Sequence, residues 1–250
     1  MAGPIVFLHG VMVDGSLWDD VVALLPDREC VVLELPLGSH TVPVPDRSRQ
    51  TPAGVAELIL EELERRELSD VTLVGCDTGG MLAQLVVARD ASRISRLVLT
   101  PCDALEVCPP ALFKPMFALG RFPLLMRAFL QPLRFTPARR LPIAFGWLTK
   151  RVDDARLARW GTPSLHDREI LRDAAAFATA CSPAVTLDVA PLLRSFKGSV
   201  MVLWPPEDPC FPISLGERVT TLFDDARLIE VEDSYCFVPV DRPDALAAVL

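Results

Sequence analysis

Short β-branched and aliphatic runs alternate along the chain with stretches whose apolar residues recur at helical spacing. Helices are predicted around 16–25, from 52 to 66 behind the N-cap Thr51, and over 78–88. Six runs have the composition of buried strands: 5–8, 30–35, 71–74, 96–100, 200–204 and 227–231. This alternation is typical of a mostly parallel sheet with helices on both faces, so we predict an α/β fold.

The strand pattern stops after residue 103. From 104 to 183 only helical stretches appear, rich in Phe, Leu, Met and Arg and interrupted by prolines, and we predict a helical cap there. Residues 1–103 and 184–250 would form the core. The large apolar side chains of the cap either all pack on this core or, as we expect, partly line a pocket. They are Phe113, Met116, Phe117, Phe122, Leu125, Met126, Phe129, Phe145 and Trp147.

The charge of the chain is unevenly distributed. With 250 residues it is long enough for one large domain, and its net charge of −8 argues against nucleic acid as a partner. Residues 104–160 hold ten Lys and Arg against three Asp and Glu, so this segment is +7 and the remainder −15. The basic segment is either a solvated face or a surface that steers an anionic or carrier-bound substrate toward the pocket.

Other functional classes lack their sequence signals. Charged residues and prolines interrupt every apolar run before the roughly 18 residues that a membrane span needs, so we expect no contact with a membrane. The N-terminus enters the first strand without a basic or cleavable segment, which favours a cytoplasmic location. The seven cysteines are scattered and form no CxxC pair, so reduced thiols are expected, and no metal or other cofactor. The sequence indicates no oligomeric state.

The segment from Val74 to Gly80 joins a predicted strand directly to a predicted helix. Its central Asp77 has small residues two positions before it and two and three positions after it, as in a nucleophile elbow, although a plain glycine-rich turn is the alternative. The residues His9, Gly10 and Val11 follow the first strand. The backbone amides of Val11 and Thr78 are therefore predicted to form an oxyanion hole, with His9 and Cys76 bordering the pocket.

On these motifs the chain resembles the α/β-hydrolase superfamily along essentially its whole length. It is more narrowly similar to the branch with aspartate nucleophiles, which contains haloalkane dehalogenases and cap-bearing epoxide hydrolases. It looks closer still to an actinobacterial group of hydrolases with the segments GNDTGG, TPCDA and LPLGSH. These stand here as residues 75–80, 100–104 and 35–40, with Cys76 in place of the asparagine of the group.

The resemblance implies where the remaining catalytic residues lie. The acid that orients the base should follow the strand that ends at Trp204, which points to Asp208, although some members place it one strand earlier, where Asp103 stands. The histidine base should follow the last strand, and there the chain has Cys236. The three histidines of the chain are His9, His40 and His166, and none follows Asp208.

The missing histidine changes the expected chemistry, because water activated by a base hydrolyses the aspartyl ester of such enzymes. What remains is a carboxyl cluster of Asp77, Asp208 and Asp103, in which burial and like charge raise a pKa toward neutrality. Our leading hypothesis is non-hydrolytic acid/base catalysis, with Asp77 as proton carrier. The reaction would be isomerisation, cyclisation, elimination or ring opening of a hydrophobic small molecule.

Other readings stay open. The chain could be a true epoxide, ester or halide hydrolase in which the Cys236 thiol or His40 replaces the base, or a ligand-binding protein without turnover. Cap-bearing epoxide hydrolases polarise the epoxide with cap tyrosines, whereas the single tyrosine here, Tyr235, lies outside the cap. Trp147 and Tyr235 are nevertheless predicted to border the pocket, and His166 to lie on the cap surface.

Overall fold

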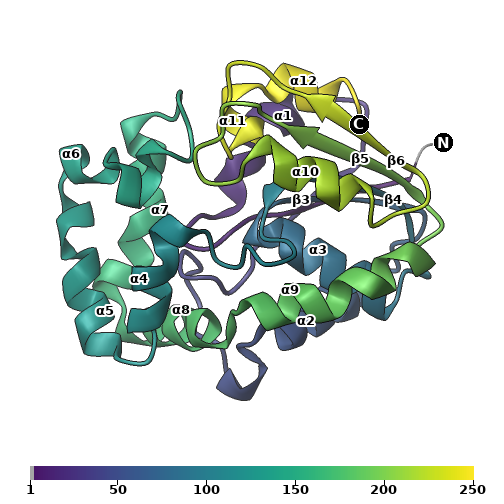
Figure 1. Cartoon of the computed structure of the whole chain (residues 1–250). Coiled ribbons are helices and arrows are strands. Elements are labelled where there is room, and N and C mark those ends of the chain that lie inside the picture. Colours follow the sequence, from purple (N-terminus) through teal and green to yellow (C-terminus); the bar gives the residue numbers. More distant parts are fainter. Residues whose placement is uncertain (1–2) are drawn as a thin grey trace.

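The computed structural model describes residues 3–250 and contains one six-stranded sheet, in the order β2-β1-β3-β4-β5-β6 (Figure 1). All five strand pairings are parallel. The strands are β1 (Ile5–Leu8), β2 (Cys30–Leu33), β3 (Val71–Asp77), β4 (Ile94–Cys102), β5 (Ser199–Trp204) and β6 (Ala226–Glu230). The predicted α/β fold and all six predicted strands are confirmed, with β2 ending two residues early and β3 and β4 extending further toward the carboxyl edge.

The strand order has its topological switch point between β1 and β3. The chain passes from β1 outward to β2 and then returns to pair β3 on the other side of β1. In open parallel sheets, ligands bind beyond the carboxyl ends of the strands at such a point. The residues after β1 and the last residue of β3, Asp77, therefore meet where a site is expected.

Helices cover both faces of the sheet. Figure 1 shows α1 (Asp19–Ala23), α11 (Val238–Asp241) and α12 (Pro243–Ala247) on one face, and α2 (Pro52–Arg65), α3 (Thr78–Arg89) and α9 (Pro183–Val189) on the other. Helix α10 (Ile213–Thr220) packs on β5 and β6. Helix α2 begins as predicted, because the Thr51 side chain accepts a hydrogen bond from the amide of Gly54 at 3.0 Å and Pro52 follows it.

The segment between β4 and β5 holds only helices and turns, apart from an isolated bridge between Ala104 and Val107. Figure 1 shows its first helices beyond the carboxyl ends of the strands, whereas α9 lies against α3. The proposed boundaries of the cap at residues 104 and 183 stay a prediction. The helices are α4 (Lys114–Leu119), α5 (Pro123–Leu130), α6 (Thr136–Arg139), α7 (Asp154–His166) and α8 (Arg168–Ala180).

Short turns complete the chain. The helix expected at 16–25 divides into a 3-10 turn and α1. Asp14 caps the turn, since its side chain accepts a hydrogen bond from the amide of Ser16 at 2.9 Å. The turns are η1 (Gly15–Trp18), η2 (Arg47–Arg49), η3 (Ala111–Phe113), η4 (Gln131–Arg134), η5 (Pro142–Gly146) and η6 (Ala190–Ser195).

Within residues 3–250 no single helix has the length and apolarity to cross a membrane. Only α8 taken together with the following 183–195 segment, bent by 60°, reaches those thresholds by length and composition.

The N-cap of α2 gives a direct test of the local fold. Replacing Thr51 with Ala leaves the amide of Gly54 without its side-chain acceptor, and we expect the free energy of unfolding to fall by about 1 kcal/mol in urea titrations. Thr51→Ser keeps the hydroxyl and should stay within about 0.5 kcal/mol of the wild type. Equal losses in both variants would contradict a role for the cap.

Candidate active site

Asp77 sits on a strained turn between β3 and α3. Its backbone has φ 55° and ψ −131°, a conformation that non-glycine residues rarely adopt. The turn needs glycines after it, because a Cβ on Gly79 would lie 2.1 Å from the carbonyl oxygen of Leu8 and one on Gly80 would lie 2.4 Å from the Cβ of Cys102. The geometry is that of a nucleophile elbow, which places the Asp77 side chain above the sheet.

The Asp77 carboxyl lies against backbone on one side and faces a cavity on the other. A Cβ on Gly10 would fall 2.0 Å from Asp77 Oδ2, so only glycine leaves room for the carboxyl there. Burial raises the pKa of Asp77 to about 6, while hydrogen bonds from the Thr78 and Val11 amides oppose the rise. The predicted oxyanion-hole amides thus contact the Asp77 carboxyl itself.

A cavity of about 360 Å³ lies above Asp77, as the sequence predicted. Asp77, Thr78 and Asp103 are the polar side chains of its lining among the described residues, and a hydrogen bond joins Thr78 to Asp103. The segment from 110 to 148 provides most of the remaining lining, which is apolar. Five of the nine predicted apolar side chains line it, namely Phe113, Met116, Phe117, Phe129 and Phe145, together with residues that the sequence analysis did not name, among them Met12, Leu130, Leu133, Leu141, Ile143 and Leu148.

The other four predicted apolar side chains lie elsewhere. Met126 is buried in the protein, whereas Phe122, Leu125 and Trp147 are exposed on the outer surface. Local sequence gives no signal for this division, because it depends on how the short helices pack against α7 and α8.

Asp103 is the second carboxyl of the cavity. It is buried just after β4, its Oδ2 accepts a hydrogen bond from the hydroxyl of Thr78 at 3.0 Å, and its Oδ1 has no partner. Burial raises the pKa of Asp103 well above its usual range, and the neighbouring Cys108 and Asp77 raise it further. Asp103 therefore releases its proton less readily than an ordinary carboxyl, and the Thr78 hydroxyl connects it to Asp77.

Asp208 lies after β5 but does not line the cavity. Its Oδ1 accepts from the amides of Cys210 at 2.7 Å and Phe211 at 3.0 Å, and its buried Oδ2 has no partner. Burial raises the pKa of Asp208 to about 7, and the negative charge of Asp77 adds to the rise. The carboxyl cluster expected from the sequence is thus electrostatically linked, although only Asp77 and Asp103 face the cavity.

Cys236 and Cys76 are fully buried beside each other and do not line the cavity either. The Cys236 thiol donates to the carbonyl of Pro101 at 3.5 Å, and the Cys76 thiol donates to the carbonyl of Cys236 at 3.4 Å. Burial is the main reason that the pKa of Cys236 is raised well above its usual range, so this thiol stays protonated.

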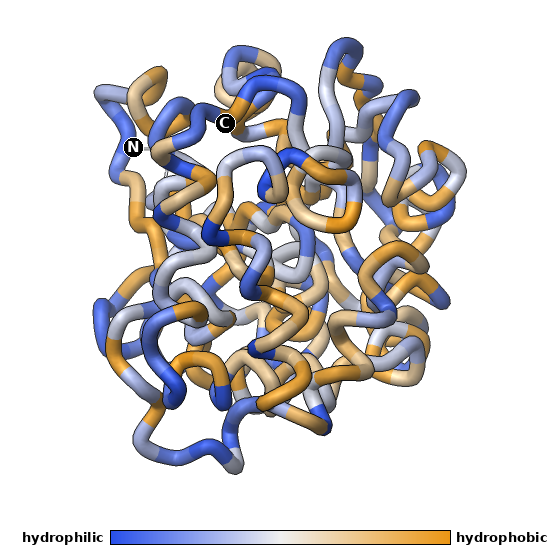
Figure 2. Tube along the Cα trace, turned by 90° about the vertical axis from the view of Figure 1, so that its left-hand side faces the viewer, coloured by the Kyte–Doolittle hydropathy of each residue, from blue (hydrophilic) through white to orange (hydrophobic). Residues whose placement is uncertain are grey.

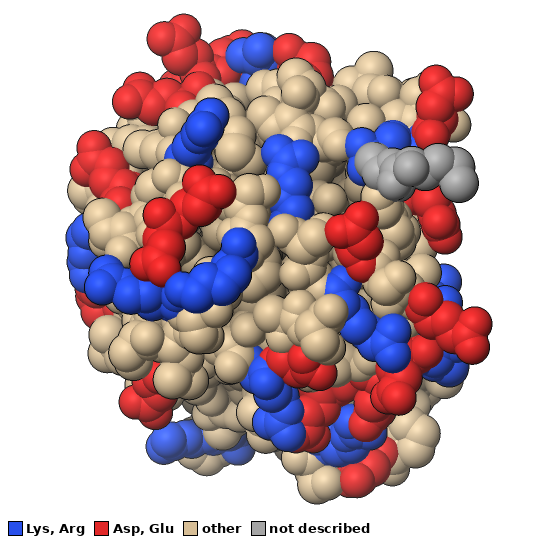
Figure 3. All heavy atoms as spheres, turned by 90° about the vertical axis from the view of Figure 1, so that its right-hand side faces the viewer, with Lys and Arg blue, Asp and Glu red and all other residues tan. Residues whose placement is uncertain are grey.

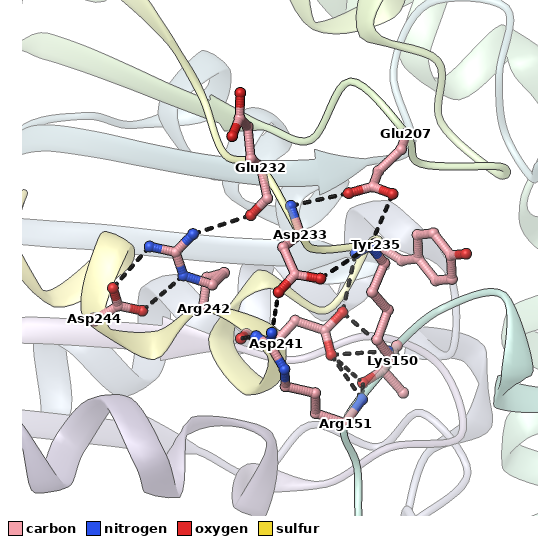
Figure 4. Close-up of polar contacts among 10 residues, drawn as sticks. Lys150, Arg151, Glu207, Glu232, Asp233, Tyr235, Asp241, Arg242 and Asp244 are labelled. Carbon is pink, nitrogen blue, oxygen red and sulfur yellow. Dashed lines mark hydrogen bonds and ion pairs between the residues drawn. The ribbon is translucent and has the colours of Figure 1, made fainter.

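The loop that carries Cys236 is fixed by a polar network at the edge of the sheet (Figure 4). The buried Asp241 carboxylate accepts from the hydroxyl of Thr149 at 2.7 Å and from the amides of Lys150 at 2.8 Å and Tyr235 at 2.9 Å. Its partners come from both the segment before α7 and the loop after β6. The network thus sets the position of Cys236 without contacting its side chain.

Two residues predicted to border the pocket point elsewhere. Tyr235 lines a separate surface hollow with Lys150, whose ammonium lies 4.9 Å from the centre of the tyrosine ring. Fully buried His9 uses both ring nitrogens for backbone hydrogen bonds, since Nδ1 donates to the Gly10 carbonyl at 2.9 Å and Nε2 accepts from the Leu35 amide at 2.9 Å. Burial lowers the pKa of His9 to about 4, so the ring is neutral. His9 therefore shapes the backbone around Val11.

The other histidines also lie away from the cavity. His40 accepts from the amide of Gly38 at 3.2 Å through Nδ1, and its Nε2 lies 3.3 Å from a carboxylate oxygen of Asp173 on α8. Asp173 is itself buried and paired with Arg47 at 2.6 Å. His166 is exposed at the end of α7, as predicted, and contacts the carbonyl of Thr162. The idea that His40 replaces the base gains no support from this geometry.

Residues 3–250 contain no group of three or more His, Cys, Asp or Glu side chains placed to hold a metal ion.

The raised pKa values of Asp77 and Asp208 predict how stability depends on pH. Both groups bind protons more tightly in the folded than in the unfolded chain, so their contribution to stability is present below about pH 4 and is lost as pH rises through about 6 and 7. We expect the free energy of unfolding to decrease between pH 4 and 8 by about 3 kcal/mol from Asp77 alone. Denaturant titrations across this range should show a smaller decrease for Asp77→Asn and Asp208→Asn. If the free energy of unfolding decreased with pH as steeply in both variants as in the wild type, the raised pKa values would be contradicted.

The comparisons with known proteins agree with this geometry. A model of the alpha/beta hydrolase family matches residues 5–249, while a search of curated proteins finds no match. An alpha/beta hydrolase fold protein from Burkholderia ambifaria aligns with a TM-score of 0.81 at 16% identity, over 100% of this chain and 90% of that one. An esterase from Thermogutta terrifontis aligns with a TM-score of 0.75 at 16% identity, over 98% of this chain and 87% of that one. An esterase from Exiguobacterium antarcticum aligns with a TM-score of 0.74 at 15% identity, over 99% of this chain and 90% of that one. The chain belongs to the alpha/beta hydrolase family.

Proposed function

We propose that this protein is an atypical enzyme of the family that transfers protons within an apolar small molecule, with Asp77 as the proton carrier. Isomerisation, cyclisation, elimination and ring opening are the reactions of this class. One observation carries the proposal. Among the described residues, the only ionisable side chains that line the cavity are Asp77 and Asp103, and both have raised pKa values.

The two carboxyls are suited to complementary roles. A group whose pKa lies near the operating pH is an effective general acid or base, and Asp77, at about 6, is mostly ionised at neutral pH and ready to accept a proton. Asp103, whose pKa is raised well above its ordinary range, is suited to hold a proton and presents an oxygen without a partner. A substrate would lose a proton to Asp77 at one atom and gain one from Asp103 at another.

The Thr78 hydroxyl allows the two carboxyls to return to their starting states. It donates its single proton to Asp103 Oδ2 at 3.0 Å, and its oxygen can accept a hydrogen bond from Asp77 once that carboxyl is protonated. After turnover Asp77 is protonated and Asp103 ionised. A proton passing from Asp77 to the Thr78 oxygen, while the hydroxyl proton moves to Asp103, restores both groups with no net gain or loss of protons.

Hydrolysis is less suited to this site. An ester formed on Asp77 needs an activated water for its release, and in α/β-hydrolases of the aspartate branch a histidine after the last strand supplies it. By the resemblance, the residue at that position here is Cys236, whose protonated thiol faces Pro101 rather than the cavity. We therefore propose that the chain is a member of the aspartate branch without the histidine base, close to the actinobacterial group that it resembles.

A hydrolase with an unforeseen base is the second candidate, and one observation favours it. The strained turn at Asp77 and the amides of Val11 and Thr78 are the features that support a nucleophilic carboxylate. A protein that binds its ligand without turnover is the third candidate, and it would leave Asp77 dispensable in every assay of chemistry.

Deuterium exchange tests proton transfer without knowledge of the natural substrate. A panel of apolar ketones that fit the cavity is incubated with the protein in D2O, and α-deuteration is followed by mass spectrometry. We expect exchange catalysed by the wild type, at least about 100-fold slower in Asp77→Asn and reduced in Asp103→Asn. The exposed Asp27→Asn is the matched control. Exchange that Asp77→Asn leaves unchanged would exclude Asp77 as the carrier.

Ester and epoxide probes test the absence of a base. We expect the wild type either to ignore these probes or to accumulate a stable adduct on Asp77, which intact mass spectrometry detects and which Asp77→Asn abolishes. In ¹⁸O-labelled water, turnover through an aspartyl ester labels the Asp77 carboxyl, whereas proton transfer does not. Rapid hydrolysis with labelled Asp77 would establish the hydrolase reading instead.

The same probes can test whether a substitution restores the missing base. Cys236→His, with Cys76→Ala to provide space beside it, should release the adduct faster than Cys236→Ala, by about 100-fold if general-base catalysis is regained. Both variants first need a wild-type circular dichroism spectrum, because residue 236 is fully buried. Equal release by both would count against the assignment of this position.

A further inference from the structure

The segment between β4 and β5 exposes many large apolar side chains. We call this surface the apolar face and define it by seven residues within 122–147. Leu124 is 79% exposed and Phe135 69%, although side chains of this kind are normally covered. Figure 2 is turned toward this side and shows hydrophobic stretches across it. The seven are Phe122, Leu124, Leu125, Phe135, Leu141, Ile143 and Trp147, whereas the other four large exposed apolar residues of the described chain are scattered.

The segment that carries the apolar face is also strongly basic. Residues 107–152 contain eight Lys and Arg and no Asp or Glu, in a protein whose net charge is −8. Among residues 3–250, Lys114, Arg121 and Arg127 take part in no ion pair. On the opposite side of the molecule acidic and basic side chains alternate, as Figure 3 shows. Exposed apolar side chains and uncompensated positive charge thus occur together in this segment of the chain.

The cavity reaches this face. Leu141 and Ile143 are exposed on the surface and also line the cavity, so they lie where it opens. Asp77 and Asp103 belong to the lining of the same cavity. An apolar molecule with one polar end would enter past Leu141 and Ile143 with that end leading.

We propose that the apolar face docks on an anionic lipid bilayer, from which the substrate passes into the cavity. A bilayer satisfies both properties of the face, because acyl chains cover the apolar side chains and phosphate headgroups attract the basic ones. Such contact needs no spanning helix. The proposal therefore departs from the expectation of no membrane contact, which was based on the absence of a spanning segment. The delivery of substrate rests on the proposed function, but the docking does not.

Vesicle flotation tests the docking. Wild-type protein is mixed with vesicles of phosphatidylcholine alone or with roughly a quarter phosphatidylglycerol, at low and high salt. We expect binding to the anionic vesicles, weaker binding to the neutral ones, and a decrease with salt. Leu124→Glu with Phe135→Glu should weaken binding by at least about 10-fold, and Arg121→Glu with Arg127→Glu should remove the preference for anionic lipid.

Matched controls separate the face from general effects. Val42 is 75% exposed and lies outside the apolar face, and Arg227 is exposed on β6, so Val42→Glu and Arg227→Glu should bind vesicles like the wild type. Asp77→Asn should also bind normally, which distinguishes a failure of docking from a failure of the proposed chemistry. The proposal is overturned if the wild type does not float, if Leu124→Glu with Phe135→Glu binds as well as Val42→Glu, or if sedimentation shows a dimer through this face that excludes lipid.

Discussion

The turn at Asp77 is the constraint on which the site depends. A non-glycine residue at φ 55° costs of order 1–3 kcal/mol, and the surrounding structure must hold it there. Gly79 and Gly80 permit the close approach of α3 to β1 and β4 that holds the turn. The strain places a carboxyl in the cavity next to two backbone amides. A relaxed turn would remove the carboxyl, its amide partners and the polar end of the cavity together.

Three buried carboxyls at the ends of successive strands differ in the hydrogen bonds that they accept. Asp77 accepts from two amides and has a pKa of about 6, and Asp208 accepts from two amides and has a pKa of about 7. Asp103 accepts only from the Thr78 hydroxyl, and its pKa is raised well above the ordinary range. Burial raises all three pKa values, the hydrogen-bond donors oppose the rise, and the negative charge of Asp77 adds to it at Asp103 and Asp208. Two carboxyls with raised pKa values thereby face the same cavity.

The loop that carries Cys236 is held by hydrogen bonds that do not involve the Cys236 side chain. Asp241 ties the loop of Cys236 to the segment before α7 through backbone amides, and those bonds are independent of the side chain at 236. The family fold can therefore persist when the chemistry at this position changes, which is why membership of the family does not establish hydrolysis. The residues that face the cavity have to decide the reaction.

The sequence by itself determined the six strands, the helix that begins at Pro52 and the turn at Asp77. Each is encoded by local features, namely the period of apolar residues, the cap at Thr51 and the spacing of glycines around Asp77. The parallel sheet then required the residues after β3, β4 and β5 to meet at one edge. The sequence also predicted a cavity, because the segment after β4 holds more apolar surface than a solvent-facing layer needs.

Only the tertiary structure decided which side chains share the cavity. Asp103 faces it and Asp208 does not, and Trp147 and Tyr235 lie outside it. His40 is paired with Asp173, a residue 133 positions further along the chain. The direction of each of these side chains depends on packing between segments far apart in sequence, and local periodicity contains no information about such contacts.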